Sequence, residues 1–305
     1  MAYDVIVIGS GPAGMSASLF LRRTNLKVLI IEKKAPGGKV LSTTFIDNYL
    51  GFRKNTGLDL ATIMYQQVKE LKIPFAFHEV LDLYYKDPSD PNSNFIVKTN
   101  KNEFEARYVV FAGGTTPKPL NIPNESEYVG RGLSFCAICD GNFYEDKDVT
   151  VIGGGNTAFE EAIYLSQICK KVTLIARSAH FSAEPILIEK AKSKSNMALY
   201  NNKTLIAFKG ERMLNQIVVE DKETKKIQEF STEGVFAYVG YIPSTCFLKH
   251  FNILNEKGYI KCDENRATII PRLYAAGDCV DKPLRQIITA VADGATCAAA
   301  IIRSL

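Results

Sequence analysis

A strand, a glycine turn and a helix occur twice in this chain, and the repeat constrains the fold more than any other feature. In the first copy, "YDVIVIGSGPAG", an apolar run at Val5–Ile8 rich in β-branched residues precedes the turn Gly9–Gly14. Such a run is typical of a strand buried on both faces of a parallel sheet. The following "MSASLFLRRT" predicts a helix, and "KVLIIE" predicts a second strand that ends at Glu32.

The first glycine turn has the G-x-G-x-x-G spacing of a dinucleotide-binding unit. The glycines permit a tight turn and close approach of the backbone to a pyrophosphate, and the helix N-terminus adds N–H donors and a favourable dipole. Glu32 is placed to accept hydrogen bonds from a ribose. The spacing alone is a weak signal, but here strand, helix and acid are in register. We therefore expect a nucleotide at Gly9, Gly11 and Gly14.

The second copy is "DVTVIGGGNTAFEEAIYLSQICKKVTLIARS". It predicts strands at Val149–Ile152 and Lys171–Ile175, with Gly153-Gly154-Gly155-Asn156-Thr157-Ala158 and a helix between them. A small residue at the third position, Ala158, lets the helix pack on the strand. Two such units in one chain predict two nucleotide-bearing ligands, usually a flavin and a nicotinamide.

Proline and glycine mark the crossings between the two units. "AGGTTPKPLNIP" reads as a strand end followed by a linker, and the chain returns near "VFAYVGYIPST". The predicted fold class is α/β, with two Rossmann-like, doubly wound, three-layer nucleotide-binding domains, the second inserted in the first. We expect one domain at 1–114 and 244–305 and the other at 115–243. The length of 305 residues suits two domains.

Charge and hydropathy exclude several classes of function. The net charge of +4 is weak and scattered, so nucleic acid is not an expected partner. No apolar stretch is long enough to span a membrane. The seven cysteines are odd in number and only one pair is close in sequence, unlike a secreted disulfide framework. This usage predicts the reducing cytoplasm.

The close pair is Cys136 and Cys139 in "SFCAICDGNF". Its spacing alone is compatible with half a zinc site, a disulfide staple or a redox switch. A structural zinc site needs four ligands. The chain has no second C-x-x-C, and His78, His180 and His250 are scattered, so no metal is expected. The other five cysteines are predicted to be small buried residues.

Taken together, the motifs resemble those of low-molecular-weight thioredoxin reductases, which are flavoprotein disulfide reductases. The resemblance covers essentially the whole chain. It rests on seven motifs in order: Gly9–Gly14, Gly37-Gly38, "DNYLGF" at 47–52, "CAICDG" at 136–141, "GGGNTAFEEA" at 153–162, "YVGYIPST" at 238–245 and "AAGDCVDKPLRQ" at 275–286.

The resemblance implies a role for each motif. Cys139 faces the flavin of FAD, Cys136 attacks the disulfide of thioredoxin by thiol–disulfide exchange, and Asp140 serves as proton donor or relay. It also implies a homodimer that alternates between two domain orientations. The FAD contacts implied are Gly9, Gly11, Pro12, Ala13, Gly14, Glu32, Gly38, Lys39, Asn48, Gly277, Asp278, Arg285, Gln286 and Ile287. The contacts implied for a nicotinamide nucleotide are Gly153, Gly155, Asn156, Thr157, Ala158 and Arg177. At Lys39 the family more often has Gln, and a positive charge there favours the reduced, anionic flavin.

One departure bears on the electron donor. Members that use NADPH carry three arginines after the strand matching Lys171–Ile175, where this chain retains Arg177 but has Ser178 and Ser182. A 2′-phosphate is a dianion that favours guanidinium groups. NADPH remains the expected donor. The alternative donors are NADH, ferredoxin and a deazaflavin. The alternative functions are a dithiol oxidase that uses oxygen and a non-catalytic flavin-binding protein.

Overall fold

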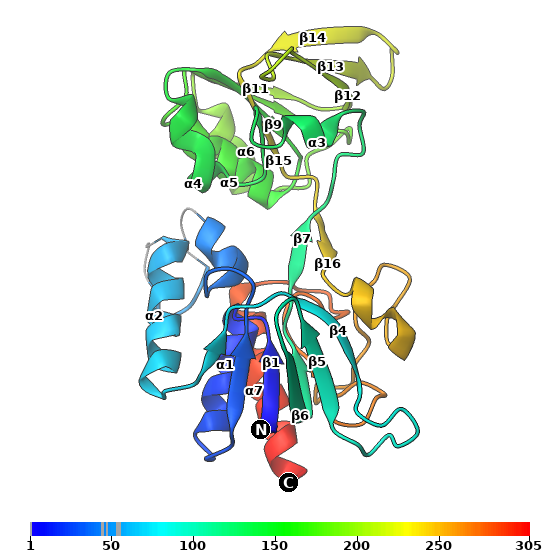
Figure 1. Ribbon diagram of the computed structural model, residues 1–305. Coiled ribbons are helices and arrows are strands. Elements are labelled where there is room, and N and C mark those ends of the chain that lie inside the picture. The colour runs from blue at the N-terminus through cyan, green and yellow to red at the C-terminus, as the bar shows by residue number, and fades with distance from the viewer. Residues whose placement is uncertain (1, 44–45, 47, 53–55) are drawn as a thin grey trace. The chain divides into compact units, whose positions relative to one another are not determined.

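The computed structural model of the chain describes residues 2–43, 46, 48–52 and 56–305 (Figure 1). By internal contacts the chain divides into two compact units. Unit 1 comprises Met1–Thr116 and Ile242–Leu305, and unit 2 comprises Pro117–Tyr241. Unit 1 is therefore built from both ends of the chain. The short strands β7 (Thr115–Pro117) and β16 (Tyr241–Pro243), where the chain passes between the units, pair with each other.

Unit 1 is built on a seven-stranded sheet with the order β3-β2-β1-β6-β5-β4, in which β17 also pairs with β6. Its strands are β1 (Tyr3–Ile8), β2 (Val28–Ile31), β3 (Phe75–Ala76), β4 (Val80–Tyr85), β5 (Phe95–Thr99), β6 (Glu103–Phe111) and β17 (Leu273–Ala275). β1, β2, β3, β6 and β17 are parallel, and β4 and β5 form an antiparallel hairpin. The apolar runs predicted as strands are the buried centre of this sheet, since Val5–Ile8 and Val28–Ile31 are buried throughout.

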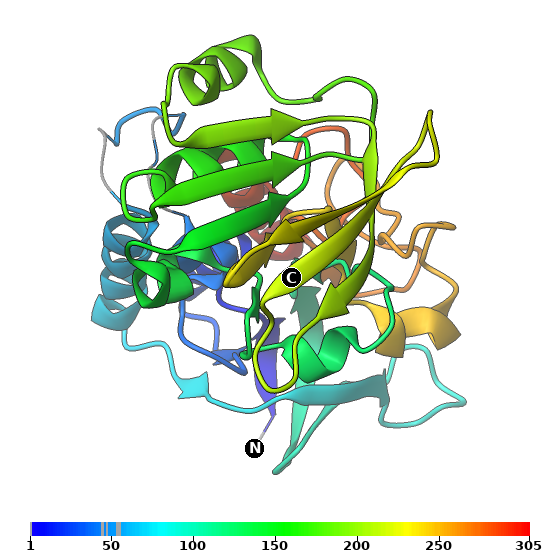
Figure 2. The ribbon, with the colours of Figure 1, turned by 90° about the horizontal axis from the view of Figure 1, so that it is seen from above.

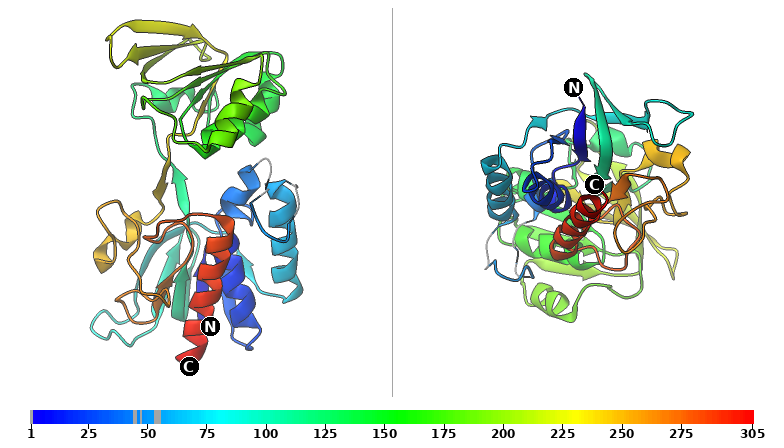
Figure 3. Two further views of the ribbon diagram at one scale, coloured as in Figure 1. Left: turned by 180° about the vertical axis from the view of Figure 1, so that it is seen from behind. Right: turned by 90° about the horizontal axis from the view of Figure 1, so that it is seen from below.

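The helices of unit 1 are α1 (Pro12–Arg22), α2 (Gly57–Glu70) and α7 (Ile287–Arg303), with the 3₁₀ turns η1 (Gly38–Ser42) and η3 (Cys246–Phe251). Although α1 and α7 lie far apart in sequence, they lie side by side, as the blue and red helices in both views of Figure 3. A Cβ added to Gly294 of α7 would lie 2.1 Å from the carbonyl oxygen of Ala13. Only a residue without a side chain allows this approach, which packs the middle of α7 directly on the backbone at the start of α1.

Unit 2 contains a second parallel sheet, with the order β11-β10-β9-β15-β8 (Figure 2, green, with β15 yellow). These strands are β8 (Leu133–Ser134), β9 (Asp148–Ile152), β10 (Lys171–Ile175), β11 (Met197–Tyr200) and β15 (Gly234–Ala237). Its helices are α3 (Glu125–Tyr128), α4 (Ala137–Asp140), α5 (Asn156–Leu165) and α6 (Pro185–Lys192), with the 3₁₀ turn η2 (Gly141–Tyr144). A separate antiparallel sheet contains β12 (Lys203–Lys209), β13 (Gln216–Asp221) and β14 (Ile227–Ser231).

Candidate active site

The two cysteines of the C-x-x-C motif form a disulfide at the start of α4 in unit 2. Cys136 is the N-cap of α4, and Cys139 lies inside the helix. Their Cα atoms are 5.3 Å apart, which is within the usual range for a disulfide. The N–H of Cys139 donates to Cys136 Sγ at 3.2 Å. The motif is therefore a closed disulfide in one helical turn. In the part of the chain described, no three His, Cys, Asp or Glu side chains gather to hold a metal.

A serine that the sequence did not single out links Asp140 to the disulfide. Ser134 Oγ donates to Asp140 Oδ2 at 2.6 Å and accepts from the N–H of Cys136 at 3.1 Å. Ser134 is 5% exposed, so water competes little for these bonds. The Asp140 carboxylate is thereby held beside Cys136. Its position in the sequence could have predicted this role, because a serine two residues before an N-cap is suited to hydrogen-bonding the backbone that follows.

The other five cysteines are free. Cys169, Cys279 and Cys297 are buried, as predicted, and Cys262 is half-buried. The prediction is wrong for Cys246, which is exposed because it opens the surface turn η3. Burial raises the pKa of Cys169 to about 11 and that of Cys279 to about 12. Both thiols therefore stay protonated and unreactive at neutral pH.

The second glycine turn lies between β9 and α5 and is shaped by a close backbone approach. A Cβ at Gly153 would lie 2.4 Å from the carbonyl oxygen of Tyr238, and the residue has φ +153°. Gly155 is the N-cap of α5, and a Cβ there would meet only Ser182 Oγ, at 3.7 Å. Ala158 is buried on the following turn of the helix, as its place in the motif predicted. The turn can thus approach a pyrophosphate closely.

The predicted nucleotide contacts Asn156 and Thr157 form the first turn of α5, and Asn156 has a partner that the sequence did not predict. Its Nδ2 donates to Glu184 Oε1 at 2.9 Å, and its Oδ1 accepts from the N–H of Glu184 at 2.8 Å. Arg177 and Ser178 are exposed just after β10, and Ser182 is exposed beside the glycine turn, where its N–H donates to the oxygen of Gly154. The three side chains expected from the sequence to lie near a 2′-phosphate are therefore exposed to solvent.

The first glycine turn, in unit 1, joins β1 to α1 in the same way. A Cβ at Gly9 would lie 2.4 Å from the carbonyl oxygen of Ala112, and one at Gly14 would lie 1.9 Å from that of Gly9. Gly11, the N-cap of α1, faces open space, and Pro12 takes the first helical position. Buried Ala13 packs on Gly277. An anionic group therefore has room at Gly11, before the N–H donors of the helix.

Glu32 lies at the end of β2, beside the first turn. Its Oε2 accepts from the N–H and Oγ–H of Ser10 at 2.8 and 2.9 Å, and its Oε1 accepts from the N–H of Lys34 at 2.9 Å. These bonds orient the carboxylate and leave acceptor capacity on Oε1. The residue thus fits its predicted role as a ribose acceptor.

The predicted contacts from η1 and from the segment after β17 meet around one ion pair. Gly38 approaches Gly11, since a Cβ there would lie 3.2 Å from Gly11 Cα. The next residue, Lys39, has its Nζ 2.6 Å from Asp278 Oδ2. Arg285 donates through Nε to the carbonyl oxygen of Asp278 at 3.2 Å. Lys39 therefore pairs with the carboxylate of Asp278, and Arg285 holds its main-chain carbonyl group.

The N-terminus of α7 belongs to the same group of contacts. Gln286 is the N-cap of α7 and its Oε1 accepts from Asn48 Nδ2 at 3.3 Å. Ile287 follows at the first helical position and packs on a small apolar cluster that includes Val40. Asp47, which opens the "DNYLGF" motif, lies outside the described residues.

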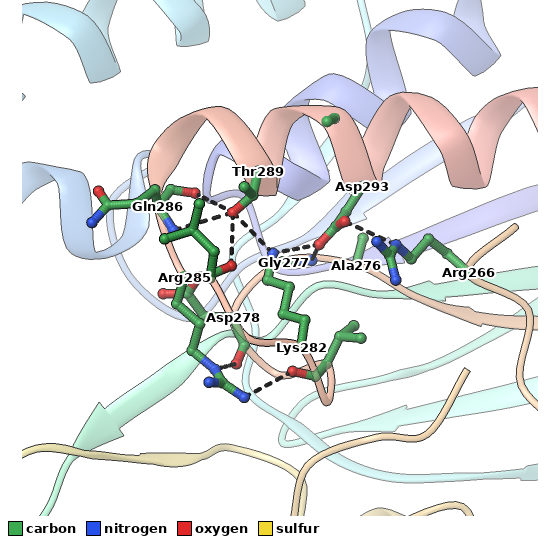
Figure 4. Close-up of polar contacts among 12 residues, drawn as sticks. Arg266, Ala276, Gly277, Asp278, Lys282, Arg285, Gln286, Thr289 and Asp293 are labelled. Carbon is green, nitrogen blue, oxygen red and sulfur yellow. Dashed lines mark hydrogen bonds and ion pairs between the residues drawn. The ribbon is translucent and has the colours of Figure 1, made fainter. Parts of the chain in front are cut away.

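A buried acid on α7 holds the loop at Gly277 and Lys282 (Figure 4). Asp293 is 3% exposed, and its Oδ2 accepts from the N–H of Gly277 at 3.0 Å and from Lys282 Nζ at 2.6 Å. Its Oδ1 lies 2.8 Å from Arg266 Nε. The sequence showed Asp293 only as a charge within an apolar helix. Such a charge indicates a buried partner, because an unpaired carboxylate is too costly to bury.

Comparison with known proteins agrees with this geometry. The family model described as pyridine nucleotide-disulphide oxidoreductase matches residues 3–294. The chain belongs to this family. Its motif-based resemblance and its predicted fold class are confirmed, and pyridine nucleotide-disulphide oxidoreductases are enzymes that act by oxidation and reduction.

Individual members of the pyridine nucleotide-disulphide oxidoreductase family match along nearly their whole length. Thioredoxin reductase of Bacillus subtilis is 36% identical, over 98% of this chain and 93% of its own. Thioredoxin reductase of Ureaplasma parvum is 39% identical, over 96% and 93%. The crystal structure of Lactococcus lactis thioredoxin reductase matches with a TM-score of 0.94 and 34% identity, over 99% and 98%.

Proposed function

We propose that this chain is a thioredoxin reductase. It passes two electrons from a reduced pyridine nucleotide, through FAD and the Cys136–Cys139 dithiol, to the disulfide of thioredoxin. The observation that carries the proposal is the Cys136–Cys139 disulfide, with Asp140 held beside it, in the same unit as a dinucleotide turn. Relatives of similar length that carry this activity in their names support it.

We assign FAD to the domain at 1–114 and 244–305 and the pyridine nucleotide to the domain at 115–243. Three features of unit 1 fit FAD: the open space at Gly11 before α1, the oriented carboxylate of Glu32 and the Lys39–Asp278 pair. When bound, FAD supplies the exchange of electron pairs between the nicotinamide and the disulfide. The residues of unit 1 named here would bind and orient it.

The two cysteines have different roles in the thiol–disulfide exchange. The thiolate of Cys136 attacks one sulfur of the thioredoxin disulfide, which forms a mixed disulfide and releases one thioredoxin thiolate. The thiolate of Cys139 then attacks Cys136 Sγ, which restores the Cys136–Cys139 disulfide and releases the second thioredoxin thiolate. Asp140, held by Ser134, donates or relays protons to the thiolates that leave. Thioredoxin gains two electrons and the dithiol loses two.

NADPH is the proposed donor. Arg177 is exposed after β10 and offers a guanidinium to the 2′-phosphate, with Ser178 and Ser182 as weaker hydrogen-bond donors. The absence of arginine from those two positions is the specific reason to test NADH and ferredoxin beside it. An anaerobic titration that follows flavin bleaching decides between them. Bleaching by micromolar NADPH supports the proposal, and bleaching by reduced ferredoxin alone replaces NADPH with another electron source.

Substitution of one cysteine tests the reductase activity itself. Cys139→Ser removes one sulfur of the dithiol, so we expect loss of thioredoxin reduction with retained flavin absorbance. The matched control is Cys246→Ser, because Cys246 is an exposed free cysteine outside the motif. Full thioredoxin turnover by Cys139→Ser would rule the dithiol out.

We also propose a homodimer located in the cytoplasm. An apolar pocket of about 340 Å³ lies between α1, α2 and residues 49–52 of unit 1. Phe20, Leu50 and Ile63 line it and are 46%, 94% and 45% exposed. Such a patch is typical of a protein interface. Light scattering should give twice the mass of 33.8 kDa for the wild type and the monomer mass for Phe20→Glu.

Among the helices described, none has the length and apolar character to cross a bilayer.

A further inference from the structure

Tyr238 connects the nucleotide turn of unit 2 to the helix that carries the disulfide. It follows β15, where its N–H donates to the oxygen of Ile152 at 2.7 Å and its carbonyl packs against Gly153. Its side chain extends to α4, where the hydroxyl oxygen accepts from the N–H of Ala137 at 2.8 Å. Burial, and then the charge of Glu161, raise the pKa of Tyr238 above its usual range, so the hydroxyl stays neutral at working pH.

The N–H of Ala137 needs this acceptor because the helix cannot provide one. The N–H groups in the first turn of any helix have no partner within the helix. The N-cap side chain reaches the second or third helical N–H, and Cys136 Sγ takes that of Cys139. Ala137 holds the first helical position and is 0% exposed, so water does not replace a partner. An unpaired buried N–H costs about 1–3 kcal/mol.

The bond matters more when the dithiol is open than when it is closed. In the oxidised protein the disulfide itself holds Cys136 and Cys139 one helical turn apart. Reduction removes that covalent link, and α4 has only four residues to maintain its own geometry. The hydrogen bond from Ala137 to Tyr238 then remains as a tether between α4 and the sheet.

We propose that Tyr238 is a positioning residue of the redox dithiol, which stabilises the reduced form of α4 and so raises the reduction potential of the Cys136–Cys139 pair. The inference rests on the proposed function of that pair. The residue acts through the backbone of Ala137 and does not contact either sulfur in the described hydrogen bonds.

Tyr238→Phe is the direct test, because it removes one oxygen and keeps the ring. The disulfide is equilibrated with glutathione redox buffers in the holoenzyme, and the fraction of reduced Cys136–Cys139 is measured by alkylation and mass spectrometry. We expect the equilibrium to shift about five- to tenfold towards the disulfide, which corresponds to a potential about 20–30 mV more negative. Tyr200→Phe is the matched control, a half-buried ring of unit 2 that packs on Phe230.

A second variant removes the other partner of the same bond. Ala137→Pro deletes the N–H, and proline is favoured at the first position of a helix. Cys136 before it has φ −147° and ψ 99°, an extended conformation that suits a residue preceding proline. In the Ala137→Pro background, Tyr238→Phe should change the potential no further. A further shift in that background would mean that Tyr238 acts through a contact other than this hydrogen bond, which would overturn the proposal.

The outcomes separate this inference from the proposed function. If the wild type shows no reversible Cys136–Cys139 couple, or does not reduce thioredoxin, the proposed function fails. If the wild type cycles and Tyr238→Phe keeps its potential, the positioning role is overturned, even where the melting temperature falls. Equal shifts in Tyr238→Phe and Tyr200→Phe would overturn it too.

Discussion

Replacing Asp293 by Asn should destabilise unit 1 more than removing its cationic partner Lys282. Asp293 is 3% exposed, and the side chain of Lys282, 2.6 Å away, is 6% exposed. The Arg266 side chain, whose Nε lies 2.8 Å from the other oxygen, is 26% exposed. Asp293→Asn removes the only negative charge of this trio and leaves two cations facing each other. Breaking a buried ion pair in this way costs about 3–5 kcal/mol.

Lys282→Met is the informative comparison. It leaves Asp293 paired with Arg266 and bonded to the N–H of Gly277, so no buried charge is uncompensated. The expected loss in unfolding free energy is about 1.5–3 kcal/mol, the size of one hydrogen bond to a charged group. Comparing the losses in unfolding free energy of the two variants therefore tests whether charge compensation, and not packing, stabilises this network.

The assay must report on unit 1 by itself. The chain has no tryptophan, so amide hydrogen exchange with mass spectrometry is preferable to fluorescence. In Asp293→Asn, the opening free energy of α7 and of residues 276–282 should fall, while β9 and β10 of unit 2 keep their protection. A loss below about 1 kcal/mol, or an equal loss in Lys282→Met, would refute the reasoning.

Three further predictions concern other parts of the chain. Phe143, in η2 just after the disulfide, is 73% exposed, which suits a side chain that docks thioredoxin. Phe143→Ala should therefore raise KM for thioredoxin about tenfold and leave kcat nearly unchanged. A similar effect of Ile227→Ala on exposed β14 would contradict this docking role. Joint replacement of Ser178 and Ser182 by Arg should lower KM for NADPH about tenfold relative to NADH, because guanidinium groups pair with the 2′-phosphate; equal gains for both nucleotides would count against it. Burial raises the pKa of Cys279 to about 12, so its contribution to the unfolding free energy is complete below the unfolded thiol pKa of about 8.5 and is lost as pH rises towards 12. In urea titrations from pH 8 to 10.5, Cys279→Ala should therefore show a shallower decline than the wild type, by up to about 1.4 kcal/mol per pH unit, and an unchanged slope would refute this.

The sequence was sufficient for the features that arise from short, local patterns. The β-branched runs before Gly9 and Gly153 are buried parallel strands, and a helix begins three residues after each of these glycines. The cysteines at 136 and 139 can meet because one helical turn separates them. Each pattern reflects backbone geometry over a few residues, so it can be recognised without knowledge of the fold.

Only the tertiary structure could decide which distant side chains meet. The bond between Ala137 and Tyr238 joins residues 101 apart in sequence, and the bonds between Asn156 and Glu184 join residues 28 apart. Sheet order sets these partners: β15 lies next to β9 and β8 in the sheet, and this brings Tyr238 to the nucleotide turn and to α4.

The same reason explains why the partners of Asp293 and Glu32 were not predicted. Lys282 and Arg266 come to Asp293 from separate loops. Glu32 was expected to serve a ribose, and the fold adds Ser10 as the donor that orients it. Motifs thus determined the chemistry of the sites, whereas long-range packing determined which groups hold each reactive side chain in place, because those contacts depend on the path of the chain through the sheets and not on local sequence.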